Sequence, residues 1–151
     1  MRILTKNVKF GDCNLIIGDY ETMLVDCGSA NRGNAKNSSS FAFSQIREEI
    51  ENKEIDSLMI SHFDTDHFNG ILQIPDDYRF ENVYLPYSIA DNKAVFTSDI
   101  ALMIAIAPEN SWGFKFSKKL IELFIKLPKI SRRITFLKRG NRVCFDGCEL
   151  R

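Results

Sequence analysis

Residues 61–70 read Ser61-His62-Phe63-Asp64-Thr65-Asp66-His67-Phe68-Asn69-Gly70 and contain both histidines of this 151-residue chain. Within them, His62, Asp64, Asp66 and His67 are four residues of metal-ligating types in six positions. In an extended loop, residues 62, 64 and 66 can project to a common side. Burying these polar groups in a core without paired cations would be costly, and an Asp-rich solvated turn is the simpler alternative. The pattern predicts a metal site, where a bound ion lowers the pKa of water so that hydroxide forms near neutral pH.

Short apolar runs on either side of this segment indicate alternating helices and strands. Ser57–Ile60 is short enough for a buried strand, and Ile71–Ile74 predicts the first turns of a helix that Pro75 ends. Earlier in the chain, apolar residues at helical spacing predict a helix over 43–51, which ends near Asn52. A helix, a strand and a further helix in this order indicate a layered α/β arrangement.

The N-terminal residues have the pattern of a strand meander. Gly11-Asp12 and Gly18-Asp19 are typical turn dipeptides, and they separate runs rich in Ile, Leu and Val. The expected strands are Ile3–Phe10, Asn14–Ile17 and Tyr20–Asp26. A polar loop is expected over Gly28–Ser40.

The later part of the chain combines helices with a second set of strands. Ser88–Ala107 has a mostly helical pattern, and an apolar stripe over 116–127 predicts a helix that Pro128 ends. The expected strands are Asn82–Pro86, Ile134–Leu137, Arg142–Phe145 and a last one from Cys148 onward. The Asp146-Gly147 turn leaves few residues for that last strand, so we expect the chain to stop within an element.

The metal-ligating segment also resembles a known motif. His62-x-Asp64-x-Asp66-His67 is similar to the His-x-His-x-Asp-His loop of the metallo-β-lactamase superfamily, with Asp64 where the second histidine is usual. The form with Asp is similar to the hydrolase domain of bacterial DNA-uptake competence channels. Gly11–Ile17 and Met23–Gly28 resemble two earlier strands of that superfamily, in the same order. The resemblance covers residues 11–70.

This resemblance implies an αββα sandwich built from two similar halves. The family's later metal ligands, which include a final histidine, lie in the second half, and no histidine follows His67 here. We therefore expect an α/β fold that represents the N-terminal half of the sandwich, with a mixed sheet and helices on one face. Residues 1–151 would form a single, incomplete domain with a helical insert at about 88–130.

The resemblance further implies a role for each matching residue. His62 and Asp64 would bind one metal ion, and Asp66 and His67 would bind a second. Asp66 would also be catalytic, by orienting the attacking water, and Asp26 would lie beneath the metals and orient the loop. One or two divalent ions are expected. Because a carboxylate replaces an imidazole, the preference moves from zinc toward manganese without excluding zinc.

The implied function is a metal-dependent hydrolase, phosphodiesterase-like or nuclease-like, that acts on a small phosphodiester or a nucleic acid. Two alternatives stay open: a truncated, non-catalytic module that binds metal or a partner, and a thioester or lactone hydrolase, since the loop fixes the metals and not the substrate. Whether the chain alone is an enzyme also stays open, because the later ligands are not in its sequence. Half a sandwich would leave an apolar sheet face open, which favours self-association or a partner chain covering that sheet.

The zero net charge of the chain hides a division. Residues 1–112 carry a net charge of −8, and residues 113–151 carry one of +8. The lysines on the helix over 116–127 and just before it are Lys115, Lys118, Lys119 and Lys126. They are typical of a solvated helix face, and a platform for a phosphodiester or nucleic acid is the functional alternative. Trp112 is expected to be half-buried in a loop. The four cysteines, Cys13, Cys27, Cys144 and Cys148, are expected to be packing residues.

Neither a membrane segment nor an export signal is indicated. The longest apolar run, Ile100–Ala107, is far shorter than the ~18 residues of a membrane span. Met1–Asn7 has no apolar core followed by a small-residue cleavage site. We therefore expect a cytoplasmic protein with reduced cysteines and no membrane partner.

Overall fold

The computed structural model describes residues 1–30, 38–86, 108–109, 111–138 and 140–150. Within this part of the chain, six strands form one mixed sheet in the order β1-β2-β3-β4-β5-β6, and two further strands form a hairpin. The sheet strands are β1 (Arg2–Thr5), β2 (Cys13–Ile17), β3 (Thr22–Cys27), β4 (Ser57–Met59), β5 (Phe80–Pro86) and β6 (Ser131–Leu137). The hairpin strands are β7 (Val143–Phe145) and β8 (Cys148–Leu150).

Helices connect the parallel strands. β1, β2 and β3 pair antiparallel, whereas β3, β4, β5 and β6 pair parallel, so each parallel pair needs a crossover connection. The described helices are α1 (Ser38–Ser44) and α2 (Arg47–Glu51) before β4, α3 (Thr65–Phe68) and the 3₁₀ helix η1 (Ile71–Gln73) before β5, and α5 (Trp112–Lys126) and the 3₁₀ helix η2 (Leu127–Lys129) before β6.

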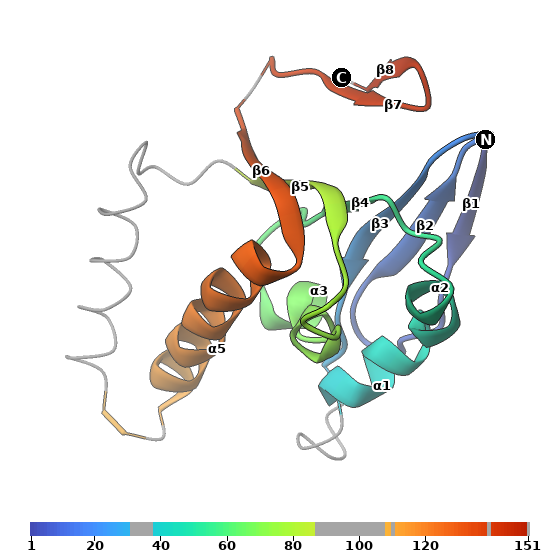
Figure 1. The fold of residues 1–151 in the computed structure, drawn as a ribbon. Coiled ribbons are helices and arrows are strands. Elements are labelled where there is room, and N and C mark those ends of the chain that lie inside the picture. The colour runs from blue at the N-terminus through green and yellow to red at the C-terminus, as the bar shows by residue number, and fades with distance from the viewer. Residues whose placement is uncertain (31–37, 87–107, 110, 139, 151) are drawn as a thin grey trace.

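The main core lies between these helices and one face of the sheet (Figure 1). Leu24 of β3, Leu58 of β4 and Val83 of β5 are fully buried there. Because side chains alternate along a strand, Met23 and Val25 belong to a second cluster on the opposite face. A mixed sheet with helices on one face is the fold class that the sequence predicts.

The β7–β8 hairpin covers part of the opposite sheet face. Val143 and Phe145 pack against Met23, which is 1% exposed, with Val25 at the edge of the cluster. Asp146-Gly147 forms the turn with φ values of 52° and 75°, as a type I′ hairpin turn requires. The sheet face that we expected to be open is therefore partly covered by the chain itself.

The N-terminal boundaries differ from the expected ones. The first strand ends at Thr5 instead of Phe10, because the chain turns at Lys9, whose φ is 64°. The polar loop expected up to Ser40 is shorter than predicted, since α1 already begins at Ser38.

The helices of the middle region are partly as predicted. The expected helix over 43–51 is two short helices, because the N–H groups of Gln45 and Ile46 bond to carbonyls three residues back and end α1. The helix over 116–127 is confirmed as α5. The helical stretch predicted over 88–107 lies outside the described residues.

The start of α5 corrects one expectation. The hydroxyl of Ser111 accepts a hydrogen bond from the N–H of Phe114 at 3.2 Å and caps the helix. Trp112 is the first helical residue, is 78% exposed, and stacks on the ring of Phe116 at a centroid distance of 5.3 Å. The expectation of a half-buried loop tryptophan was wrong.

The cysteines divide into two pairs. Cys13 and Cys27 are buried opposite each other on β2 and β3, as expected of packing residues. Cys144 and Cys148 are exposed on the hairpin, so for these two the packing expectation was wrong. None of the helices in the described ranges is long and apolar enough to span a membrane.

Candidate metal centre

The metal-ligating segment lies at the carboxyl end of the parallel strands. β4 ends at Met59, residues 60–64 form an irregular connection, and α3 begins at Thr65. The β1–β2 loop reaches the same end of the sheet, where the N–H of Asp12 donates to the carbonyl of Asp66 at 3.3 Å. Loops at this edge commonly form ligand sites in α/β proteins. The fold thus places the predicted site where binding is favoured.

Asp26 occupies a bulge near the end of β3. The register between β2 and β3 shifts at Cys13, and Asp26 takes a left-handed φ of 57°. A bulge redirects a side chain, and Asp adopts this conformation more readily than most residues. The buried Asp26 carboxylate accepts from the Ser61 N–H at 2.8 Å and from the Ser61 hydroxyl at 2.6 Å, and Nδ1 of His67 lies 3.0 Å away. The Asp26 carboxylate therefore contacts both Ser61 and His67, and its role in orienting the loop stays a prediction.

These hydrogen bonds determine which ring nitrogen of each histidine carries hydrogen. A carboxylate only accepts, so His67 donates to Asp26 through Nδ1. The single hydroxyl hydrogen of Ser61 is also used on Asp26, so the Ser61 oxygen accepts from Nδ1 of His62 at 2.9 Å. In their neutral forms both rings then carry the free lone pair on Nε2, which is available to a metal.

Each Nε2 atom faces a carboxylate. Nε2 of His62 lies 3.5 Å from Oδ2 of Asp64, and Nε2 of His67 lies 3.5 Å from Oδ2 of Asp12. Two ligands that bind one tetrahedral ion at about 2.1 Å are roughly 3.4 Å apart. The two rings lie beside each other with centroids 3.6 Å apart. Donor types and separations therefore suit a divalent ion at each of two neighbouring pairs.

The described ranges contain no group of three or more His, Cys, Asp or Glu side chains placed to hold a metal ion. Each pair supplies two ligands, and the rest of a coordination shell would come from other groups. The structure brings His62 and Asp64 to within 3.5 Å of each other, and their binding of one ion stays a prediction. At His67, the carboxylate facing Nε2 is that of Asp12, and the ligand and catalytic roles of Asp66 stay predictions.

Close backbone packing holds the β1–β2 loop against the metal-ligating segment. A Cβ on Gly28 would lie 2.3 Å from the carbonyl group of Asp66. A Cβ on Gly11, whose φ is 140°, would lie 2.4 Å from the carbonyl oxygen of Gly28. Rigid backbone atoms cannot move aside, so only glycine allows these approaches.

Three residues of the site, Asp12, Ser61 and Asn69, are not predicted from the sequence. Gly11-Asp12 has the pattern of a turn, and nothing in the nearby sequence indicates that the Asp12 side chain lies beside His67. Ser61 links His62 to Asp26, and the only sign of this in the sequence is that Ser61 precedes His62. The buried Asn69 side chain accepts from the N–H of Ser29 at 3.1 Å and donates to its carbonyl at 2.8 Å, which fixes the end of the segment.

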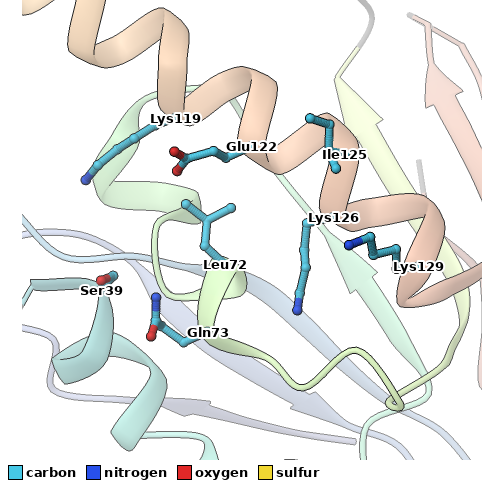
Figure 2. A pocket seen from close by; sticks show the side chains of 8 residues that line it. All are labelled: Ser39, Leu72, Gln73, Lys119, Glu122, Ile125, Lys126 and Lys129. Carbon is cyan, nitrogen blue, oxygen red and sulfur yellow. The ribbon is translucent and has the colours of Figure 1, made fainter.

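The basic helix α5 packs against the metal-ligating segment through Phe63 and Phe124, whose ring centroids are 5.6 Å apart. A groove of about 370 Å³ lies between α5, η1 and α1. Figure 2 shows Lys119 on one side of Leu72 of η1, and Lys126 and Lys129 on the other side.

The groove is close to charge balance. Lys126 and Lys129 both form ion pairs with the Asp76 carboxylate, and these pairs hold the pKa of Asp76 below its usual value. Glu122 adds a further negative charge to the groove lining. The predicted anion platform therefore depends on other cations, such as the exposed Lys115 and Lys118.

Comparison with known families identifies the superfamily to which this fold and its His/Asp segment belong. A model of the metallo-beta-lactamase superfamily matches residues 7–90, which is more than half of the chain. This protein belongs to the metallo-beta-lactamase superfamily, as its sequence motif suggests. That superfamily usually depends on divalent metal ions.

Among solved structures, the chain is similar to the crystal structure of MEM-A1, a subclass B3 metallo-beta-lactamase isolated from a soil metagenome library. The two chains are 16% identical and align with a TM-score of 0.44, over 93% of this chain and 45% of that one. The chain thus spans less than half the length of that lactamase. A comparison with curated proteins gives no match.

Proposed function

We propose that this chain carries the metal-binding half-site of a hydrolase that cleaves phosphodiester bonds. The observation that carries the proposal is the hydrogen-bond chain from Asp26 through Ser61 to His62, together with the bond between Asp26 and His67. It presents two imidazole nitrogens beside each other, each facing a carboxylate. Membership of a metal-dependent superfamily supports the same chemistry.

The residues around the loop have separate tasks in this proposal. His62, Asp64 and His67 would hold the metal, with Asp66 as a further ligand, and their mixed nitrogen and oxygen donors suit zinc or manganese. The bound ion supplies Lewis acidity, which polarises the phosphoryl oxygen and lowers the pKa of water. Asp26 keeps the imidazoles in their metal-binding orientation, and Asp66 orients the attacking water by accepting its hydrogen bond.

Charge supports an anionic substrate. Residues 113–151 carry a net charge of +8, and α5, which holds several of these cations, contacts the loop through Phe124 and Phe63. A positive potential beside a reactive centre raises the local concentration of anions. Phosphodiesters carry one negative charge per group and match this field.

Hydrolysis of bis(p-nitrophenyl) phosphate, with added Mn²⁺ or Zn²⁺, tests the proposal. We expect turnover that falls to background in His62→Ala and in Asp66→Ala. Asp77→Ala is the matched control, because Asp77 is an exposed carboxylate outside the centre. Turnover that survives both site substitutions would contradict the proposal, and turnover of a thioester or lactone alone would move the assignment to those substrates.

A second candidate function is a non-catalytic module that binds metal and a partner chain. It is favoured by the lack of a third ligand at either pair within the described residues. Half-buried apolar side chains on the outer sheet face, including Ile16, Val25 and Met59, point to the same function. Metal binding without turnover, together with association in analytical ultracentrifugation, would support this candidate over the hydrolase.

A further inference from the structure

Asp12 lies at the metal centre although the His/Asp motif does not include it. Its Oδ2 is 3.5 Å from Nε2 of His67, and its side chain is 52% exposed. We propose that Asp12 is a metal ligand that binds the same divalent ion as His67. This inference rests on the proposed function and adds to it a ligand from a separate loop.

The backbone of Asp12 is fixed at this position. Its N–H donates to the carbonyl of Asp66 at 3.3 Å, and its carbonyl accepts from the N–H of Gly28 at 3.0 Å. Gly11 permits the close approach, since any Cβ there would overlap the Gly28 carbonyl. The β1–β2 loop is thus attached both to α3, through Asp66, and to Gly28, which directly follows β3. A ligand on such a support is preorganised for its ion.

The nitrogen that faces Asp12 is the one available to a metal. Nδ1 of His67 is occupied by the buried Asp26, which leaves Nε2 as the lone-pair nitrogen of the neutral ring. The His67 side chain is only 12% exposed, whereas Asp12 opens to solvent and gives an ion a path of entry. The pair formed by His62 and Asp64 has the same 3.5 Å separation.

An ion pair between Asp12 and a protonated His67 is the competing explanation. It involves the same two side chains, so loss of affinity in one variant does not separate the two by itself. A bond from residue 12 to the metal does separate them. A thiolate bound to Co²⁺ gives strong charge-transfer absorption in the near ultraviolet, and this absorption requires a direct sulfur–metal bond.

The experiment combines calorimetry with this spectroscopic probe. In isothermal titration with Zn²⁺, we expect Asp12→Asn to bind at least about tenfold more weakly than the native chain, since even outer-shell partners contribute about 10–100-fold. Asp77→Asn should bind like the native chain. With Co²⁺, Asp12→Cys should produce the charge-transfer band, which should be absent from the native chain and from Asp77→Cys. The four native cysteines are present in every sample and serve as an internal control.

The possible results separate this inference from the function on which it rests. Native-like Zn²⁺ affinity in Asp12→Asn, combined with loss of binding in His67→Ala, would overturn the ligand role of Asp12 and leave the proposed function standing. Absence of the band in a folded Asp12→Cys that still binds Co²⁺ would also overturn it. A native chain that binds neither Zn²⁺ nor Mn²⁺ would overturn both proposals.

Discussion

The Ser61 hydroxyl donates to Oδ2 of Asp26 at 2.6 Å, and Nδ1 of His67 bonds to the same oxygen atom at 3.0 Å. Because Ser61 also accepts from His62, one carboxylate oxygen orients both imidazole rings. The side-by-side placement of the rings therefore depends on a single buried residue. A substitution of Asp26 should therefore affect both histidines, whereas loss of the Ser61 hydroxyl should affect only the orientation of His62.

Ser61→Ala removes the relay between Asp26 and His62. We expect metal affinity to fall about tenfold, at the low end of the effect of outer-shell partners, because the direct bond from Asp26 to His67 remains. Isothermal titration with Zn²⁺ measures this change. ¹⁵N NMR of the imidazoles should show a mixed tautomer for His62 alone. Ser61→Thr retains the hydroxyl and should bind like the native chain, and a similar loss in both variants would contradict the relay.

Gly28→Ala should destabilise the fold strongly. The new Cβ would lie 2.3 Å from the backbone carbonyl group of Asp66, which cannot move without shifting α3. We expect the free energy of unfolding to fall by about 3 kcal/mol or more. Gly113→Ala is the matched control, because no atom lies within 4 Å of its Cβ position on α5. That change should raise stability by up to about 1 kcal/mol. Urea unfolding measures both changes. An equal change in unfolding free energy in Gly28→Ala and Gly113→Ala would contradict the close packing at Gly28.

Asp146 should make stability depend on acid pH. Hydrogen bonds from the N–H groups of Asp19 and Tyr20 hold the pKa of Asp146 below its usual value. Its folded pKa is thus below its unfolded one, so its contribution is complete above the ordinary value of about 3.9 and is lost as pH falls through the folded pKa. The stability difference between the native chain and Asp146→Asn should therefore shrink in acid. A difference that stays constant from pH 7 to below pH 3 would contradict this linkage.

Tyr78 should make stability depend on alkaline pH. Burial raises its pKa to about 12. The folded pKa exceeds the unfolded one, so the contribution is complete below about pH 10 and is lost as pH rises through the folded value. The Tyr78 hydroxyl also donates to the carbonyl of Ile55 at 2.5 Å and accepts from its N–H at 3.1 Å. Tyr78→Phe leaves both groups unpaired, which should cost about 1–3 kcal/mol at pH 7. Thermal unfolding across this pH range measures both effects, and unchanged stability would contradict them.

The sequence is informative where chemistry is local. Four ligand-type residues in six positions predict the metal-ligating segment, and an apolar stripe followed by Pro128 predicts α5. Asp26 is predicted only through the family resemblance, because its role depends on a bulge that strand patterns do not report. The helix over 43–51 fails as a single element, since spacing alone does not show where the chain bends at Gln45 and Ile46.

The parts that the sequence does not predict depend on contacts between distant segments. Asp12 lies beside His67 because Gly11 and Gly28 allow close contacts between backbone segments. A Gly-Asp dipeptide looks the same in the sequence whether it only forms a turn or also places its carboxylate in a site. Trp112 is exposed at the first residue of α5, whereas Leu120 and Leu123, further along the same helix, are buried. Such placements follow from packing, and packing is not readable from one segment alone.

The bond between Asp146 and the N–H of Asp19 joins positions 127 residues apart. During synthesis, the β2–β3 turn therefore leaves the ribosome long before its partner exists. Until the β7–β8 hairpin arrives, Met23 and its neighbours remain a bare apolar strand surface, which is prone to pair with other nascent chains. The hairpin therefore covers this surface only late in synthesis. A chain that ends before Val143 should need chaperones more than the longer chain does.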